Sequence, residues 1–202
     1  MLLFGKKSYK TKTLEELIHN AQQDDLDALE EIVKRNQENV YASFYYLSNN
    51  CEDILDLTQE ALVKMAKNIK KLKDVTKFKA WLNQIVTRLF YDYIRSKNRK
   101  LQTVPFEKKD NEFEQNKFSV TDVPCKECTP EESSLNKELN CIIENSIHKL
   151  PDSFRLAIVL REFQGLSYEE IATITNTNVG TVKSRIARAR SKLQQDLKAY
   201  IA

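Results

Sequence analysis

The sequence predicts an all-α protein made of two small helical domains joined by a flexible linker. Turn-forming residues are scarce, with three Gly and four Pro in 202 residues, whereas a β-rich chain of this length needs more. Apolar residues recur at steps of three and four through most of the chain, which is the spacing of one helix face. The periodicity is lost in one internal stretch, so we expect domains at 13–100 and 133–202 and a linker at 101–132.

Four helices are expected in the first domain. Thr13 suits the N-cap of the first helix, because two acidic residues follow it in the first turn. Apolar stripes at helical spacing define the other three, which fall within 26–44, 53–72 and 77–96. Phe78 and Trp81 belong to the buried stripe of the last helix, which predicts a place in the core rather than a role in base stacking.

The linker contains three of the four prolines, an excess of acidic residues and the pair Cys125-x-x-Cys128. A zinc site needs two further ligands, and the nearest candidates are Cys141 and His148 on an expected helix. A lone CxxC is a weak motif, so we expect free thiols in a reducing compartment, with no metal and no cofactor. A redox switch at this pair stays open as an alternative.

Composition argues against several classes of protein. The chain has no run of about 18 apolar residues, so no membrane span is expected. Its first residues place their charges after the apolar ones, unlike a signal peptide, and a cytoplasmic location follows. The sequence has two histidines and no glycine-rich phosphate loop, so we expect a protein that is not an enzyme.

The stretch after Gly165 has the pattern of a helix-turn-helix. Ser167 and Glu170 form a capping box at the start of a short helix. Asn176 suits the left-handed conformation of a tight turn, and Asn178 is a good N-cap for a second helix. Two short helices joined by such a turn are typical of proteins that read duplex DNA.

The second helix of this pair, 179–193, is basic on the side away from its apolar stripe. Such a helix fits the major groove, where Lys and Arg bond guanine edges and phosphates. A solvated basic face is the alternative interpretation, but the caps and the turn favour DNA binding. The basic residues off the stripe are Lys183, Arg185, Arg188, Arg190 and Lys192.

The last third of the chain resembles region 4 of the extracytoplasmic-function (ECF) group of sigma-70 family RNA polymerase sigma factors. The matching motifs are Leu150-Pro151, Gly165-Leu-Ser-Tyr-Glu-Glu-Ile-Ala172, Val179-Gly-Thr-Val-Lys-Ser-Arg185 and Ala189-Arg190. The resemblance implies that the second helix reads the −35 promoter element. It implies base-edge contacts at Lys183, Ser184, Ala187 and Arg188, and phosphate contacts at Thr181 and Arg185. Thr175 and Thr177 stand at turn positions that are usually apolar in the family.

The first domain resembles region 2 of the same family at Asp53-Ile-Leu-Asp-Leu-Thr-Gln-Glu60, which matches the pattern D-x-x-D-L-x-Q-E. The resemblance implies docking on the clamp helices of the polymerase β′ subunit. An ordinary amphipathic helix with a solvated outer face is the alternative. The implied docking residues are Asp53, Asp56, Leu57, Gln59, Glu60 and Lys64.

A second region 2 motif runs from Phe78 to Arg95 and is similar to F-x-x-W-L-x-x-I-x-x-N-x-x-x-D-x-x-R. In the family this helix and the loop before it take the −10 element as melted single strand, with a basic groove for the backbone and a pocket for an unstacked base. Arg88 stands where the family usually has Asn. The implied contacts are Lys73, Asp74, Val75, Thr76, Lys77, Arg88, Asp92 and Arg95.

The sequence therefore predicts a sigma factor. The resemblance implies three partners: core RNA polymerase, through its β′ clamp helices and β flap; promoter DNA; and an anti-sigma factor. One alternative is a dimeric helix-turn-helix regulator with an N-terminal sensor domain, which would bind a palindromic site without polymerase. Another is an RNA-binding or polymerase-interacting adaptor that makes no promoter choice. The two region 2 motifs favour the sigma factor.

Overall fold

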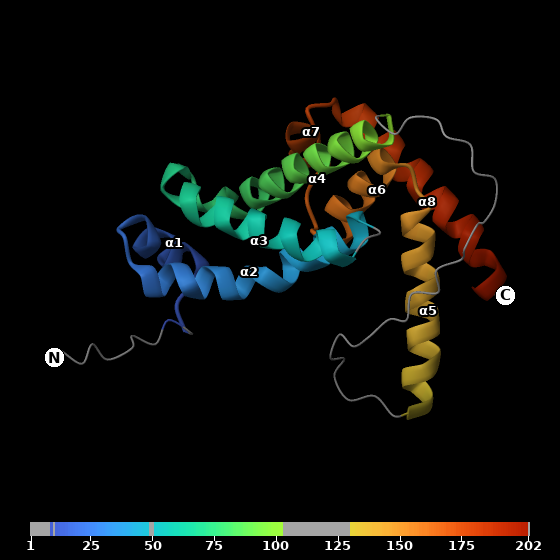
Figure 1. Ribbon diagram of the computed structural model, residues 1–202, viewed down its shortest axis with the longest axis horizontal. Helices are drawn as coiled ribbons and strands as arrows, with labels where there is room; N and C mark the ends of the chain where they lie inside the picture. The colour runs from blue at the N-terminus through green and yellow to red at the C-terminus, as the bar shows by residue number, and fades with distance from the viewer. Residues whose placement is uncertain (1–8, 10, 49–50, 103–129, 202) are drawn as a thin grey trace.

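The computed structural model describes residues 9, 11–48, 51–102 and 130–201. In these ranges every regular element is a helix (Figure 1), which confirms the all-α prediction. The elements are α1 (Leu14–Gln22), α2 (Leu26–Leu47), α3 (Cys51–Asn68), the short helices η1 (Ile69–Lys71) and η2 (Val75–Lys77), α4 (Phe78–Gln102), α5 (Pro130–His148), α6 (Asp152–Ile158), the π-helical turn η3 (Val159–Phe163), α7 (Tyr168–Thr175) and α8 (Val179–Ile201).

The start of α1 follows the prediction. The Thr13 side chain accepts from the Glu16 backbone N–H at 3.3 Å, and the Glu16 carboxylate accepts from the Thr13 N–H at 2.9 Å, which completes a capping box. Leu14 and Leu26 stand at the helical spacing of the apolar stripes of the first two helices, where burial is expected, but both are exposed. Each is the first residue of its helix, so it lies outside the part of the helix that packs against the core.

Helix α1 is also tied to the chain that follows α3. The Gln22 amide donates to the carbonyl oxygens of Ile69 at 3.1 Å and of Leu72 at 2.8 Å. The Ile69 carbonyl also accepts from the Leu72 N–H at 3.1 Å, so the Gln22 amide adds a side-chain donor to carbonyl groups at the end of a helix. These bonds hold the end of η1, from which the loop to η2 and α4 begins.

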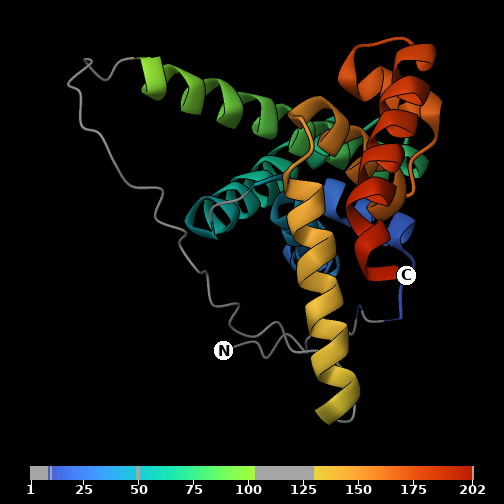
Figure 2. The same ribbon diagram turned by 90° about the vertical axis from the view of Figure 1, so that its right-hand side faces the viewer.

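The second half of the chain packs on the first. Helix α2 contacts α5, α6 and η3, and α4 contacts α7, so that α7 lies beside α4 in Figure 1 and α5 extends away from the other helices in Figure 2. One contiguous apolar core includes residues from both halves, from Leu17 in α1 to Ala189 in α8. The sequence did not predict this shared core.

Most of the predicted linker lies outside the residues that the structure describes. Helix α4 continues to Gln102 and α5 begins at Pro130, and residues 103–129, with Cys125 and Cys128, lie outside the described residues. In the described part of the chain, no group of three or more His, Cys, Asp or Glu side chains is arranged to hold a metal ion. Among the described helices, none has both the length and the apolar character of a membrane span.

Candidate nucleic-acid and polymerase interfaces

Helix α7 begins as the sequence predicted. The Ser167 N–H donates to the Glu170 carboxylate at 2.8 Å, and the Glu170 N–H donates to the Ser167 hydroxyl at 3.1 Å. The bonds from Ser167 hold the pKa of Glu170 below its usual value. Gly165, just before this helix, has a φ of 62°, a conformation that glycine adopts without strain.

The turn after α7 is also as predicted. Its two threonines stand where the family usually has apolar residues, and both have hydrogen-bond partners. Asn176 is left-handed, with φ 51° and ψ 49°. The Thr175 hydroxyl donates to the Ile171 carbonyl at 2.7 Å and lies 2.9 Å from the Thr177 hydroxyl. A hydrogen-bonded pair of hydroxyls thus occupies the turn positions where apolar side chains were expected from the family pattern.

Helix α8 presents one continuous exposed face. Its N-terminus is capped by Asn178, whose side-chain oxygen accepts from the Thr181 N–H at 2.7 Å. Val182, Ile186 and Ala189 are buried, which fixes the rotation of the helix. Four of the predicted contacts are exposed and two are half-buried; the exposed ones are Lys183, Ser184, Ala187 and Arg188, and the half-buried ones are Thr181 and Arg185.

Tyr168 supports this face, a role that the sequence did not predict. The Lys183 ammonium lies 5.8 Å from the centre of the Tyr168 ring, and the Arg161 guanidinium lies 4.7 Å from it. Both distances fit cation–π contacts. Arg190 is exposed, as predicted for an outward basic residue, and it pairs with Glu162 at 2.5 Å. Tyr168 stands one residue after the Ser167 cap, and no pattern in the sequence marks it as a neighbour of Lys183.

The loop before α4 is shaped by one carboxylate. Asp74 accepts from the backbone N–H of Thr76 at 3.1 Å and from its hydroxyl at 2.5 Å, and the hydroxyl bond is the main reason why the pKa of Asp74 is lowered. Lys73, Asp74, Thr76 and Lys77 are exposed, whereas Val75 is half-buried against the core. The residues of this loop that were predicted to contact DNA are therefore accessible to solvent, except for Val75, whose side chain mainly packs against the core.

On α4 the predicted contacts share one side. Arg88, Asp92 and Arg95 are exposed at steps of four and three, and the Arg95 guanidinium lies 3.4 Å from the Asp92 carboxylate. Phe78 is buried in the core, and Trp81 packs against it with ring centres 5.9 Å apart. Both aromatic residues take part in packing, as the apolar stripe predicted.

Helix α3 carries the predicted docking residues, with one correction. Asp56, Gln59 and Glu60 are exposed, and Glu60 pairs with half-buried Lys64 at 2.8 Å. Leu57, however, is buried in the core, because it belongs to the apolar stripe at steps of three and four, so its side chain does not form part of the exposed face.

Asp53 is half-buried and accepts from the Tyr93 hydroxyl at 3.0 Å, which ties α3 to α4. Two apolar residues that the sequence analysis missed, Leu55 and Val63, are 56% and 48% exposed. They fall outside the apolar stripe, and that position could have identified them as surface residues.

Comparison with known proteins gives the same two regions. Residues 32–100 match the family model "Sigma-70 region 2", and residues 142–193 match "Sigma-70, region 4". The ECF RNA polymerase sigma-E factor of Haemophilus influenzae is 35% identical over 182 residues, which cover 90% of this chain and 93% of that protein. This chain belongs to the ECF sigma factors. Regions 2 and 4 below mean the two matched ranges.

Two further relatives of this sigma factor show the extent of the similarity. The ECF RNA polymerase sigma factor SigE of Mycolicibacterium smegmatis is 32% identical over 169 residues, covering 83% of this chain and 61% of that protein. The solved structure of the sigma factor RpoE with the anti-sigma factor NepR from Bartonella quintana matches with a TM-score of 0.64 and 26% identity. That match covers 85% of this chain and 97% of that one.

In this sigma factor α4 of region 2 contacts α7 of the region 4 helix-turn-helix. Burial raises the pKa of Tyr91 in α4, and the positive charge of Arg185 in α8 opposes that rise. Tyr91 lies between Arg88 and Arg95 on α4, one turn from each. The helix-turn-helix of region 4 thus packs on α4 through α7, whereas the exposed face of α3 with Asp56, Gln59 and Glu60 belongs to a separate helix of region 2.

Proposed function

We propose that this sigma factor directs core RNA polymerase to promoters by reading the −35 element with α8 and the −10 element with α4 and the loop before it. The exposed face of α8 is the observation that supports the proposal most directly. Lys183, Ser184, Ala187 and Arg188 are accessible together because buried residues fix the helix rotation. A helix in the major groove needs such a face, with side chains that reach guanine edges and phosphates.

The −10 assignment has separate support. Four exposed basic residues border the loop and α4: Lys73, Lys77, Arg88 and Arg95. A basic surface of this kind binds the phosphate backbone of a single DNA strand. Asp74 fixes the loop through its bonds to Thr76, so the loop is ordered before DNA binds. We therefore assign unstacked −10 bases to the surface between this loop and Arg88.

The polymerase contact is proposed for the outer face of α3. Leu55 and Val63 are apolar and exposed, and Asp56, Gln59 and Glu60 lie beside them. An apolar centre with a polar rim is the usual composition of a protein interface. We propose that this face docks on the β′ clamp helices, with Leu55 in place of Leu57 as an apolar contact, and that region 4 contacts the β flap.

The two regions are joined by enough chain to reach both elements. The −10 and −35 elements are about 25 base pairs apart by their positions, which is about 85 Å along B-form DNA at about 3.4 Å per pair. Residues 103–129, if fully extended at about 3.3 Å per residue, reach up to about 90 Å. Binding of one region then raises the effective concentration of the other at its own element.

We further propose that an anti-sigma factor controls this chain, because a similar sigma factor, RpoE of Bartonella quintana, was solved with the anti-sigma factor NepR. We place the chain in the cytoplasm, where polymerase and promoters are found, and we propose that it adds no catalytic group to the polymerase.

Run-off transcription with purified core polymerase tests the proposed function. Core enzyme plus this chain should start at defined positions on genomic templates, and core enzyme alone should not. Tight sequence-specific binding to duplex DNA without polymerase would instead support a dimeric regulator. Association with polymerase without any defined start would support the adaptor and overturn the proposal.

A further inference from the structure

The loop that we assign to the −10 element, residues 73–77, is held in place by helix α1. Helix α1 contacts both η1, which precedes the loop, and η2, which lies within it. Figure 1 shows α1 beside the turn between α3 and α4. The family match for region 2 begins at residue 32, so α1 lies outside that match, and the sequence analysis assigned no part in promoter recognition to it.

The contact is made by the amide of Gln22, the last residue of α1. Its nitrogen donates to the carbonyl oxygen of Ile69 at 3.1 Å and to that of Leu72 at 2.8 Å. A primary amide has two N–H groups, so the two bonds use both of them. Gln22 is half-buried and both partners are buried, so water competes for these bonds less than it does on an open surface.

The bond to Leu72 sets the direction in which the loop begins. The Leu72 carbonyl and the Lys73 N–H belong to one planar peptide group, so a donor that holds the oxygen also orients the bond to Lys73. Leu72 is the C-cap of η1, with φ −73° and ψ 109°, an extended conformation that takes the chain out of the helix. The Gln22 amide therefore fixes the peptide plane from which the exposed Lys73 side chain starts.

The rest of the loop is fixed by its own residues. Asp74 accepts from the backbone N–H and the hydroxyl of Thr76, and Phe78, directly after the loop, is buried in the core. The anchor at Leu72 differs from these two, because its donor comes from α1, about fifty residues earlier in the chain. The loop thus presents its exposed side chains from a backbone that is held at both ends.

A second link between α1 and η1 lies on the surface. The Lys70 ammonium is 2.5 Å from the Asp24 carboxylate, and the two side chains are 54% and 80% exposed. Ion pairs this exposed contribute little, because water and salt screen them. The positioning of the loop therefore depends on the Gln22 amide rather than on this ion pair.

We infer that Gln22 is a positioning residue for −10 recognition, because its amide holds the loop in the one arrangement that presents its side chains to the −10 bases. The inference rests on the proposed function. A loop that is ordered in advance loses less conformational freedom when it binds, and contacts that are held loosely distinguish poorly between ligands. Without the amide the loop still binds DNA, but it penalises a wrong −10 base less.

Gln22→Met tests the inference, because methionine has a side chain of about the same length and has no N–H to donate. Holoenzyme made with this variant transcribes templates that carry single −10 or single −35 substitutions. The ratio of transcript from the intact promoter to transcript from the −10 substituted templates should fall by at least about threefold, a change of the size expected for lost hydrogen bonds. The same ratio for the −35 substitutions should not change, and a general loss of stability would not produce this difference.

Two neighbouring residues of Gln22 provide matched controls. Gln23→Met makes the same change at the next residue, which is exposed. Asp24→Asn removes the charge of the surface ion pair and keeps a residue type that tolerates the left-handed conformation of Asp24, with φ 67°. Both variants should keep the −10 preference of the wild-type chain, and a loss in Asp24→Asn equal to that in Gln22→Met would overturn the assignment to the amide.

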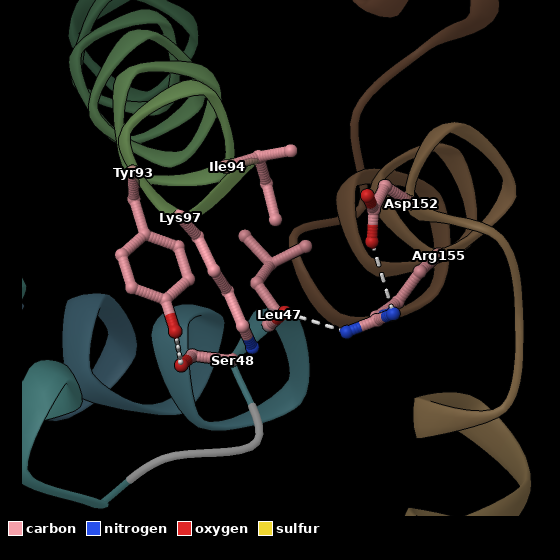
Figure 3. A pocket seen from close by; sticks show the side chains of 7 residues that line it. All are labelled: Leu47, Ser48, Tyr93, Ile94, Lys97, Asp152 and Arg155. Atoms are coloured by element: carbon pink, nitrogen blue, oxygen red, sulfur yellow. Dashed lines mark hydrogen bonds and ion pairs between the residues drawn. The ribbon is translucent and has the colours of Figure 1, made fainter. Parts of the chain in front are cut away.

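Arg155→Met controls for stability. Arg155 donates to the Leu47 carbonyl at 2.8 Å, beside a cavity that α4 lines with Tyr93 and Lys97 (Figure 3). Tyr93 is about 22 Å along α4 from Phe78, where the loop ends. This variant should lower the midpoint of urea unfolding and keep the −10 preference.

Hydrogen exchange in the free chain measures the loop itself. The Leu72 and Lys77 N–H groups donate to the carbonyls of Ile69 and Asp74, both at 3.1 Å. Exchange at these two amides should be several-fold faster in Gln22→Met, with no change in α8. If the variant gives too little transcript for a comparison, this measurement decides: faster exchange confined to residues 69–77 supports the inference, and faster exchange throughout α1–α4, or no change, overturns it.

The outcomes separate this inference from the proposed function. Normal transcription by Gln22→Met with an unchanged −10 preference, or an equal loss of −10 and −35 preference, overturns the positioning role while the proposed function stands. No promoter-specific transcript from the wild-type chain contradicts the proposed function itself.

Discussion

The guanidinium of Arg155 donates to the carbonyl oxygen of Leu47 at 2.8 Å, across 108 residues of sequence. Arg35 makes the same kind of bond within the first half of the chain, to the carbonyl oxygens of Tyr9 and Lys12, both at 2.9 Å. The two arginines make the same kind of bond at two places, one between the regions and one within the first half of the chain. They therefore form a matched pair for separating interregion contact from general stability.

We predict that Arg155→Met loosens the packing of α6 on α2 and that Arg35→Met does not. Both changes remove a charged donor from backbone carbonyls, at a cost of about 1.5–3 kcal/mol, so both should lower the midpoint of urea unfolding. In a chain whose own four cysteines are replaced by serine, spin labels are attached to cysteines introduced at the exposed positions Gln84 in α4 and Thr173 in α7. Only Arg155→Met should lengthen the distance between these labels under native conditions, and equal distances in the two variants would show that Arg155 does not hold region 4 on region 2.

We predict that acid weakens the contact between α5 and α2 through His148. Burial first, and then the positive charge of Arg155 on α6, lowers the pKa of His148 from the usual 6.5, although its bond to Tyr45 on α2 acts the other way. Glu144 on α5 faces the same Tyr45. A pKa lowered in the packed state means that the contact is favoured above pH 6.5 and is lost as the pH falls through the lowered value.

The same label pair measures this effect between pH 7.5 and pH 5.5, as the fraction of chains that show the short distance. His148→Gln should remove most of the pH dependence of this fraction. The other histidine, His19, is exposed on α1, so His19→Gln should leave the pH dependence unchanged. A short-distance fraction that rises in acid would contradict the prediction.

We predict that Lys183→Ala and Arg188→Ala weaken −35 recognition by about 1–3 kcal/mol each and relax the base preference. Both side chains are exposed on the reading face of α8. Lys198→Ala is the control, because Lys198 is an exposed lysine of the same helix about 15 Å farther along it. Transcription by holoenzyme from templates with single −35 substitutions measures the change, and an unchanged base preference in both variants would remove these residues from the reading face.

We predict that Leu55→Asp and Val63→Asp each weaken binding to the β′ clamp helices by about tenfold or more, as expected for apolar contacts near the centre of an interface. Both side chains are about half exposed, so the fold should be kept. Leu26→Asp tests the same chemistry at a residue that is 76% exposed on α2, away from the proposed surface. Titration of the clamp helices should separate the first two variants from the third.

We predict that Asn178→Ala lowers the free energy of unfolding by about 1 kcal/mol, the usual cost of losing an N-cap. Its side-chain oxygen holds the Thr181 N–H at the start of the recognition helix. Thr173→Ala, which removes an exposed hydroxyl from mid-α7, should change stability by less than about 0.5 kcal/mol. Urea unfolding monitored by circular dichroism measures both, and similar values would show that the cap contributes little.

The sequence alone determined the features of this protein that depend on near neighbours. The N-cap at Thr13, the capping box at Ser167, the left-handed Asn176 and the cap at Asn178 each follow from residues within a few positions of one another, and the structure has all four. Helical periodicity likewise predicted the buried side of α8 and placed its basic residues outside.

Only the tertiary structure decided how the two regions meet. Arg155 and Leu47, or Gln164 and Ser43, are hydrogen-bonded but far apart in the chain, and no local pattern shows that one is the other's partner. The same holds for the contact between the Tyr168 ring and Lys183. For Leu55, the helical periodicity places the residue outside the core but does not identify its neighbours. Helix formation depends on contacts three and four residues apart, which a sequence displays, whereas the packing of helices depends on long-range contacts that arise only when the whole chain folds.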